Sequence, residues 1–166
     1  MTTLYIAVFI LVVLIGFALL LIKLLTSQEQ QEKALPYKAK QYLFSRSEHE
    51  FLKTLHEQID TSRYSIFPKV RLADFVEVTA KGKEYQGYWN KISSKHIDFL
   101  VWDVQENSIV LAIELDGKSH NSQKMQERDE FVNNLYERVG IKLERVSVGS
   151  DFKTISSTIA QKLKQQ

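Results

Sequence analysis

The feature that most constrains this chain is an uninterrupted apolar run near its amino terminus, LYIAVFILVVLIGFALLLI, from Leu4 to Ile22. The run has no charged residue and no polar face, which makes it a poor candidate for a helix packed in a soluble core. At 1.5 Å per residue, a helix of this length spans roughly 28 Å, close to the roughly 30 Å thickness of the hydrocarbon layer of a bilayer. We therefore predict a transmembrane helix within residues 1–25.

A cleaved signal peptide is the alternative for this segment. Signal peptides usually have a basic start, a shorter apolar stretch and small residues at the cleavage site. Here the start, MTT, is uncharged, and LLTSQEQ has no A-x-A pattern. No basic residue precedes the run, whereas Lys23, Lys33, Lys38 and Lys40 follow it. By the positive-inside rule we expect a single-pass protein of the inner membrane, with its soluble domain in the cytoplasm.

The composition of the whole chain is that of an ordinary globular protein, with 44% hydrophobic and 25% charged residues among 166. The absence of cysteine excludes disulfides and cysteine zinc sites, and agrees with a reducing compartment. A net charge of +2 does not require a nucleic-acid partner, so any basic patch would have to be created by folding. We predict a polar linker over residues 26–42, which contains Pro36, and one domain over residues 43–166.

Within that domain the pattern predicts an α/β fold in the order helix, strand, two-stranded hairpin, helix, strand, helix. Ser45 and Glu48 carry the capping-box signature of a helix. Helices are expected over residues 46–58, 122–139 and 150–163, and strands around residues 70–76, 97–103, 109–115 and 141–148. A loop with Gly82 and Gly87 is expected before the hairpin. Since both hairpin strands are apolar on both faces, helices should cover both sides of the sheet.

Acidic residues interrupt the two apolar hairpin strands, in the stretches HIDF and AIELDGKSH. If the hairpin turns at Glu106, Asp98 lies opposite Glu114, and His96 lies opposite Asp116. Directly opposed side chains have Cβ atoms about 4.5–5.5 Å apart, and like charges so placed are destabilising unless something lies between them. Carboxylate oxygens are the ligands that Mg²⁺ or Mn²⁺ prefers. We therefore expect Asp98, Glu114 and Asp116 to bind a divalent metal.

These stretches, together with LFSRSEHEFLKTL, VRLADFV and ERDEFVNNLYERVGIKLERV, resemble a bacterial domain family of unknown function in the PD-(D/E)XK nuclease superfamily, related to the very-short-patch-repair endonucleases. The resemblance covers residues 36–148. It implies a restriction-endonuclease-like mixed sheet flanked by helices, and metal-dependent hydrolysis of phosphodiesters in nucleic acid. Asp98 and Glu114 would be the first and second metal-binding acids, and Glu48 the acid that some members add from the first helix.

One position departs from the superfamily pattern, because the E-x-K motif calls for lysine at residue 116 and this chain has Asp116. Lys118 could replace that lysine, and His120 or His96 could transfer a proton. The resemblance thus implies a candidate Mg²⁺-dependent endonuclease whose catalytic residues are Asp98, Glu114, Asp116, Lys118 and His120. Phosphate contacts are expected from Arg128, Lys118 and Lys95.

Each of these residues also has a structural interpretation. Glu48 can simply complete the capping box, and Asp116 with Gly117 is a common turn pair. Lone histidines are often satisfied by local hydrogen bonds, and Arg128 with Asp129 suits a solvated helix face. For Asp98 and Glu114 the structural interpretation is weakest, because acids inside apolar strands are costly unless paired or metal-bound.

An alternative function is a module that kept the nuclease fold, lost the chemistry, and binds nucleic acid or protein. Asp116 favours this alternative, whereas the intact pair of Asp98 and Glu114 favours the enzyme. A purely structural membrane-tethered protein would leave these acids without a role.

Overall fold

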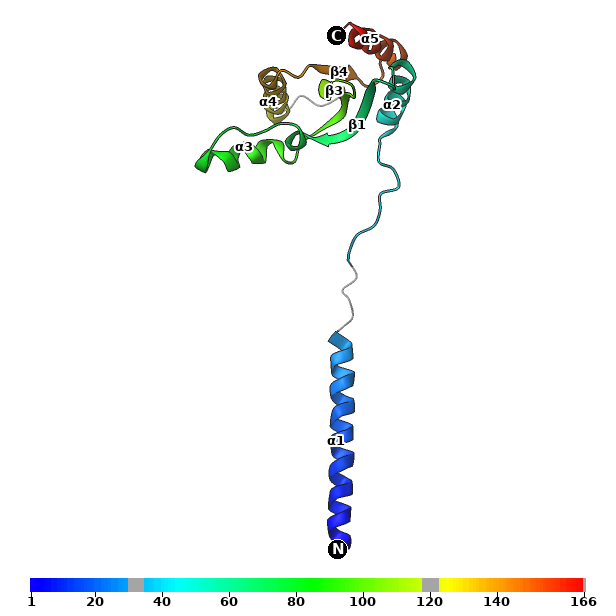
Figure 1. Ribbon diagram of the computed structural model, residues 1–166, viewed down its shortest axis with the longest axis vertical. Helices are drawn as coiled ribbons and strands as arrows, with labels where there is room; N and C mark the ends of the chain where they lie inside the picture. The colour runs from blue at the N-terminus through cyan, green and yellow to red at the C-terminus, as the bar shows by residue number, and fades with distance from the viewer. Residues whose placement is uncertain (30–34, 118–122, 166) are drawn as a thin grey trace. The chain divides into compact units, whose positions relative to one another are not determined.

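The computed structural model describes residues 1–29, 35–117 and 123–165, which form two compact units, Met1–Gln41 and Tyr42–Gln166. In the first unit, α1 (Thr2–Glu29) is one continuous helix (Figure 1). Its segment Thr2–Leu25 is 24 residues long, has no part buried inside the protein, and is long and apolar enough to cross a membrane.

The described part of the second unit contains a four-stranded sheet and four α-helices. In chain order these are α2 (Arg46–Gln58), β1 (Tyr64–Arg71), α3 (Tyr85–Ile92), β2 (His96–Asp103), β3 (Ser108–Asp116), α4 (Gln123–Val139), β4 (Leu143–Ser147) and α5 (Phe152–Lys164). The strands lie in the order β1-β2-β3-β4. The first two pairings are antiparallel and the pairing of β3 with β4 is parallel, so this is a mixed α/β sheet.

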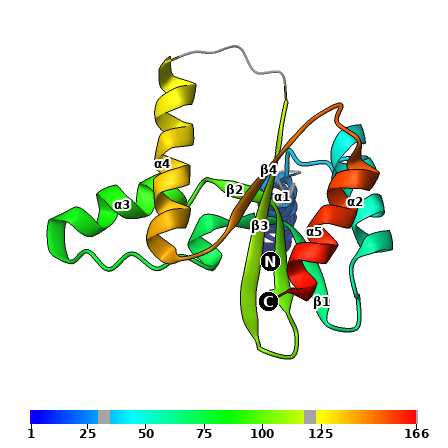
Figure 2. The same ribbon diagram turned by 90° about the horizontal axis from the view of Figure 1, so that it is seen from above.

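Helices cover both faces of the sheet, as predicted from the apolar hairpin strands. Figure 2 shows α4 on one side and α2 with α5 on the other. On the α2 and α5 side, Phe51 is fully buried between Phe99 of β2 and Phe152 of α5, with ring centroids 5.7 and 5.3 Å away. On the α4 side, Val132 and Tyr136 belong to the second buried cluster. The two layers fix the sheet and therefore the residues at its ends.

Local signals place the helix ends where the sequence predicts them. At the start of α2, the Ser45 hydroxyl accepts the Glu48 backbone N–H at 3.3 Å, and the Glu48 carboxylate accepts the Ser45 N–H at 2.8 Å. This is the predicted capping box, and it is confirmed. Helix α4 ends before Gly140, whose φ of 71° lies in the left-handed region that favours glycine.

Two sequence predictions were wrong. The strand expected around residues 70–76 is β1, which ends at Arg71, and Leu72–Asp74 form a 3₁₀ turn instead. Pro68 fits inside β1 because β1 lies at the edge of the sheet, where a missing N–H breaks no ladder on the open side. The loop expected before the hairpin contains α3, whose Tyr85, Tyr88 and Ile92 follow helical spacing despite Gly87.

The hairpin register agrees with the prediction only near the centre of the strands. Phe99 pairs with Ile113 and Val101 with Leu111, as expected for a turn at Glu106. The register then shifts, so that Trp102 pairs with Ile109. Near Asp98, the carboxylate Oδ2 of Asp98 accepts the backbone N–H of Leu115 at 2.9 Å. The ladder ends at Phe99–Ile113, so it contains neither the predicted opposition of Asp98 to Glu114 nor that of His96 to Asp116.

Candidate functional site

A lysine holds the first group of acidic residues together. Lys69 Nζ donates to Glu48 Oε1 of α2 and, at 2.8 Å, to Asp98 Oδ1 of β2. The second oxygen of Asp98 is used by the Leu115 N–H, so this carboxylate is bound on both sides. Glu48 also divides its two oxygens, because Oε2 serves the capping box while Oε1 receives Lys69. Glu48 therefore has the structural role and lies beside Asp98 as well.

The backbone of Lys69 is strained. Its φ is 55°, in the left-handed region, which costs a non-glycine residue about 1 kcal/mol or more. Regular strand pairs flank it, Pro68 with Phe99 and Val70 with Ile97. Burial would lower the pKa of Lys69, but hydrogen bonds from its ammonium to Asp98 and Glu48 outweigh this and raise that pKa. Strain of this kind tends to occur at functional sites, and here it coincides with a charged cluster.

An arginine holds the second group. Arg145 of β4 lies beside Glu114 because β3 and β4 are parallel neighbours. Its Nη1 is 3.1 Å from Glu114 Oε2 and donates to Asp116 Oδ1 at 2.9 Å. Its Nη2 donates to Asn133 Oδ1 of α4 at 3.1 Å and lies 3.9 Å from Asp129 Oδ1.

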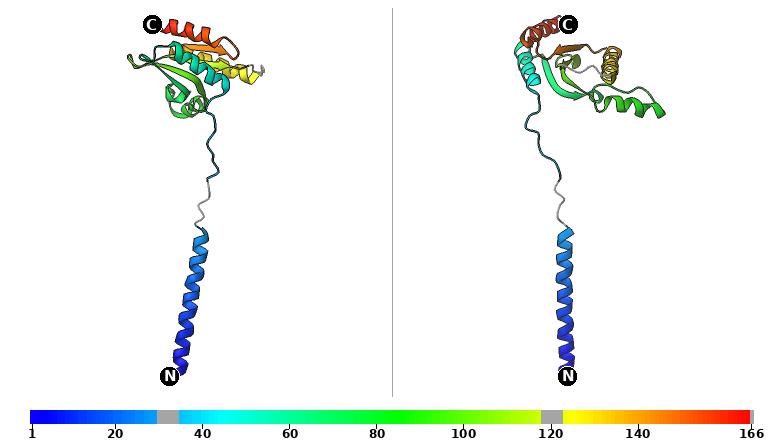
Figure 3. Two further views of the ribbon diagram at one scale, coloured as in Figure 1. Left: turned by 90° about the vertical axis from the view of Figure 1, so that its right-hand side faces the viewer. Right: turned by 180° about the vertical axis from the view of Figure 1, so that it is seen from behind.

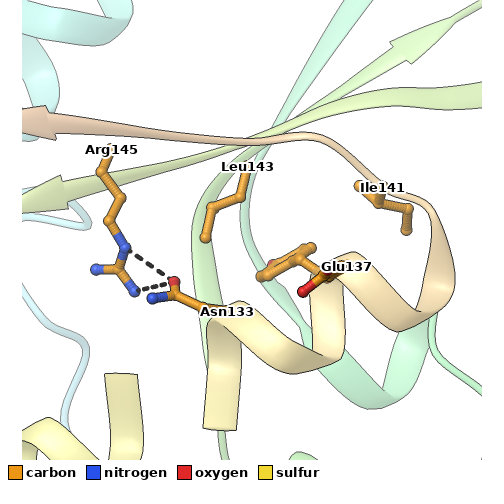
Figure 4. A pocket seen from close by; sticks show the side chains of 6 residues that line it. Asn133, Glu137, Ile141, Leu143 and Arg145 are labelled. Atoms are coloured by element: carbon orange, nitrogen blue, oxygen red, sulfur yellow. Dashed lines mark hydrogen bonds between the residues drawn. The ribbon is translucent and has the colours of Figure 1, made fainter. Parts of the chain in front are cut away.

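Figure 4 shows Arg145 extending from β4 toward Asn133 beside an open pocket. The pocket has a volume of about 390 Å³ and is lined by residues of α4, β4 and the turn between them, namely Asn133, Tyr136, Glu137, Ile141, Leu143 and Arg145. Arg145, the basic residue of the second cluster, therefore borders this pocket.

Glu114 is the electrostatic centre of these acids. Its side chain is only 16% exposed. Burial raises the pKa of Glu114, Arg145 and Arg128 act to lower it, and the negative charges of Asp116 and Asp98 raise it further, with a net increase. The carboxylates of both clusters thus act on one another, because Asp98 belongs to the first cluster and Asp116 to the second. A perturbed buried acid of this kind is a common mark of a functional site.

A buried hydroxyl lies next to the second cluster. Tyr136 of α4 is almost completely buried, and its hydroxyl oxygen has no hydrogen-bond partner among the described residues. Burial and the charge of Glu114 raise the pKa of Tyr136, while Arg145 opposes the change. A buried polar atom without a partner is uncommon and often lies where a ligand or catalytic group acts.

The structure brings four predicted acids into two neighbouring clusters. Glu48 and Asp98 meet at Lys69, while Glu114 and Asp116 meet at Arg145. Within the described ranges, no three His, Cys, Asp or Glu side chains are gathered around one point as metal ligands. The predicted catalytic residues Lys118 and His120 lie outside the described residues.

The remaining predicted residues are members of neither cluster. Arg128 is exposed on α4, and its charge acts on Glu114. His96 is exposed and pairs with Arg71 of β1 in the strand ladder. The hydrogen bond from Arg71 is the main cause of the lowered pKa of Asp74, to which His96 adds. Lys95 lies before β2, with its Nζ donating to the Lys91 carbonyl at 2.7 Å.

Sequence reasoning missed Lys69, Arg145 and Tyr136. Lys69 and Arg145 stand singly in the strand sequences IFPKVRL and LERVS, where a basic residue usually faces solvent. The one signal was indirect, since clustered acids in apolar strands need cations nearby. The predicted strand register could not show which basic residues would pair with the acids.

The second unit is thus a mixed α/β domain whose sheet carries two adjacent acidic clusters, each closed by a basic side chain. A family model described as a protein of unknown function, DUF2726, matches residues 40–163. This is most of the chain, and the protein therefore belongs to the DUF2726 family. No curated protein and no solved structure gives a significant match.

Proposed function

We propose that this protein is a membrane-anchored, nuclease-like enzyme that hydrolyses phosphodiesters in nucleic acid with the help of Mg²⁺ or Mn²⁺. The observation that carries the proposal is the placement of Asp98 near the start of β2 and of Glu114 and Asp116 at the end of β3. Glu114 is largely buried there, and Asp116 and Asp98 add to the effect of burial in raising its pKa. Carboxylates that lie close to one another and partly out of water oppose folding unless their charge is compensated or used.

The fold supports the same proposal. A helix, a mixed four-stranded sheet and helices on both faces agree with the restriction-endonuclease-like architecture that the resemblance implies. Asp98 lies near the start of β2, and Glu114 lies near the end of the adjacent strand β3. We therefore propose that the domain has the restriction-endonuclease-like fold and the acidic metal site that belongs to it.

The donor groups fit a hard divalent cation in chemical type, since all are carboxylates. Asp98, Glu114 and Asp116 would hold the ion, which would have to draw them together, because no three acids gather around one point among the described residues. Glu48 lies beside Asp98, since Lys69 contacts both. Such an ion polarises a phosphate and lowers the pKa of a water bound to it. Lys69 and Arg145 neutralise these acids. When the metal binds, they would give up part of their ion pairs with the acids.

The side chains themselves supply the remaining roles. Asp116 stands where the superfamily has lysine, and Lys69 brings a lysine ammonium to Asp98 from another strand. Lys118 and His120 remain proposed catalytic groups, and Arg128 a proposed phosphate contact. The helix α1 would hold the domain on the cytoplasmic side of the inner membrane, where nucleic acid is present.

A catalytically inactive binding module is the second candidate. The observation that favours it is that all four acids already have basic partners, Lys69 and Arg145. A site that is neutralised by its own chain needs no metal to remain folded. The two candidates differ in whether metal binding and cleavage occur.

The test uses the full-length chain in an uncharged detergent, incubated with duplex and single-stranded DNA and RNA in Mg²⁺, Mn²⁺ or EDTA. We expect cleavage that EDTA abolishes and that Glu114→Gln removes, together with calorimetric metal binding that Glu114→Gln weakens. The matched control is Glu144→Gln on β4, a glutamate paired with Lys162 at 2.8 Å and absent from both clusters. Metal and nucleic-acid binding without cleavage would favour the binding module instead.

A further inference from the structure

Helix α3 and the residues next to it carry a group of exposed and partly exposed aromatic and basic side chains that the acidic clusters do not use. Figures 2 and 3 show α3 projecting from the sheet on the same side as α4. We define the α3 surface as Tyr85, Tyr88, Trp89, Lys91 and Lys95 with Phe131 of α4. Tyr85 and Tyr88 are 41% and 49% exposed, although each has a large apolar ring. Exposed rings that gather in one place usually mark a binding surface.

The lysines of this surface lie over aromatic rings. Lys91 Nζ is 5.2 Å from the ring centre of Tyr88 and 5.8 Å from that of Phe131, and Lys95 Nζ is 5.4 Å from Phe131. Tyr85 and Trp89 stack on each other with centroids 6.2 Å apart and an angle of 12°. Cations and ring faces therefore alternate over a short distance.

A hollow adjoins this surface between α3 and α4. It has a volume of about 640 Å³ and is lined mainly by apolar side chains, including Val76, Ile92 and Leu135, with Tyr88 and Phe131 at the lining as well. Glu77, Glu84 and Arg138 also line it, so its charged side chains are negative on balance and disfavour a phosphate group inside. An apolar ring suits this hollow better than an anion does, so phosphates should follow Lys91 and Lys95.

We infer that the α3 surface binds single-stranded nucleic acid, with bases stacking on Tyr88 and its neighbouring rings and phosphates paired with Lys91 and Lys95. Surfaces that hold single strands combine a basic track with aromatic platforms, because every base has a ring face and every linkage a charge. The residues from 81 to 95 carry four lysines and one glutamate, which complements a polyanion.

The inference rests on the proposed function, which makes nucleic acid the ligand. It adds a path along which a single strand reaches the acidic clusters. Lys95 immediately precedes β2, whose third residue is Asp98. A strand bound along α3 would therefore lead toward the acidic clusters. This arrangement favours single strands or unpaired ends over a rigid duplex, whose bases are not free to stack.

The test measures fluorescence anisotropy of a labelled oligothymidylate of about 12 nucleotides, within the usual range of single-strand sites. The full-length chain is kept in an uncharged detergent with EDTA, so that no cleavage occurs. Tyr88→Ala should weaken binding by about 5- to 150-fold, the range that loss of one stacked base gives. Lys91→Ala should lower the slope of log affinity against log salt by about 0.7, the value for one phosphate contact on a single strand. Tyr88→Ala should leave that slope unchanged.

Matched controls are Lys53→Ala, an exposed lysine of α2, and Phe67→Ala, a half-exposed ring of β1 that packs on Trp102 at 5.9 Å. Both should bind as the wild type does. Equal losses in the control and α3 variants, or no binding by the wild type, would overturn the inference. Since the assay contains no metal, failure of cleavage with intact binding would reject only the proposed enzyme. Cleavage with unchanged binding in Tyr88→Ala and Lys91→Ala would reject only the α3 surface.

Discussion

A carboxyl group held mostly out of water, next to two other carboxyls, is unfavourable in the folded protein. Glu114 is in this position, since burial and the charges of Asp116 and Asp98 raise its pKa more than Arg145 and Arg128 lower it. The folded state therefore holds the proton of Glu114 more tightly than the unfolded chain does. The tighter binding of this proton stabilises the folded state. The stabilisation is complete below the ordinary pKa of 4.5 and is lost as pH rises through the raised pKa of Glu114.

We predict that Glu114→Gln makes the metal-free protein more stable at pH 7, because the variant removes an unfavourable charge while Asp116 still pairs with Arg145 at 2.9 Å. The gain should disappear in acid, where the wild-type carboxyl is protonated. The free energy of unfolding is measured by urea unfolding in EDTA, followed by tryptophan fluorescence, at pH 7 and in acid. A variant that is less stable at pH 7 would contradict the sign, and Glu144→Gln should show no comparable gain.

The sequence predicted the acidic residues at the site but not their partners. Asp98, Glu114 and Asp116 stood out because charged residues are rare inside apolar strands. Lys69 and Arg145 did not stand out, since their role depends on a left-handed backbone at one position and on the parallel pairing of β3 with β4. Such contacts arise only after the strands have their final neighbours.

At the scale of the elements, helix boundaries were more predictable than strand boundaries. The ends of α2 and α4 are set by local chemistry, namely the capping box at Ser45 and the left-handed Gly140. By contrast, β1 contains Pro68, which the sequence pattern disfavours inside a strand and which only the edge position permits. Helix α3 is eight residues long and contains Gly87, so its helical signal was short and weak.

The start of α2 joins this local chemistry to the site, because Glu48 takes part in both. We predict that Ser45→Ala destabilises the protein by about 1 kcal/mol through loss of the cap, with little effect on metal affinity. Glu48→Gln should change metal affinity and have little effect on stability. Glutamine can still accept the Ser45 N–H, but it no longer neutralises Lys69. Chemical unfolding and metal calorimetry on both variants separate the two roles. Parallel losses in the two measurements would mean that Glu48 acts only through the fold.

At the scale of the whole molecule, the chain combines an apolar helix with a mixed α/β domain of the DUF2726 family. The proposed activity requires that the domain meet nucleic acid, so the side of the membrane on which it lies is decisive. Only the sequence addresses this, through basic residues that follow α1 and none that precede it.

We predict that a fluorescent reporter fused after Gln166 is active and that alkaline phosphatase at the same position, which needs the periplasm, is inactive. The physical reason is that Lys23, Lys33, Lys38 and Lys40 resist transfer across the membrane and keep their end of α1 inside. Replacing these four lysines with glutamine is the matched variant, and it should weaken the orientation. Full-length protein in the membrane fraction is expected on an immunoblot. A shortened chain in the soluble periplasmic fraction would instead identify the segment as a signal peptide and remove the domain from cytoplasmic nucleic acid.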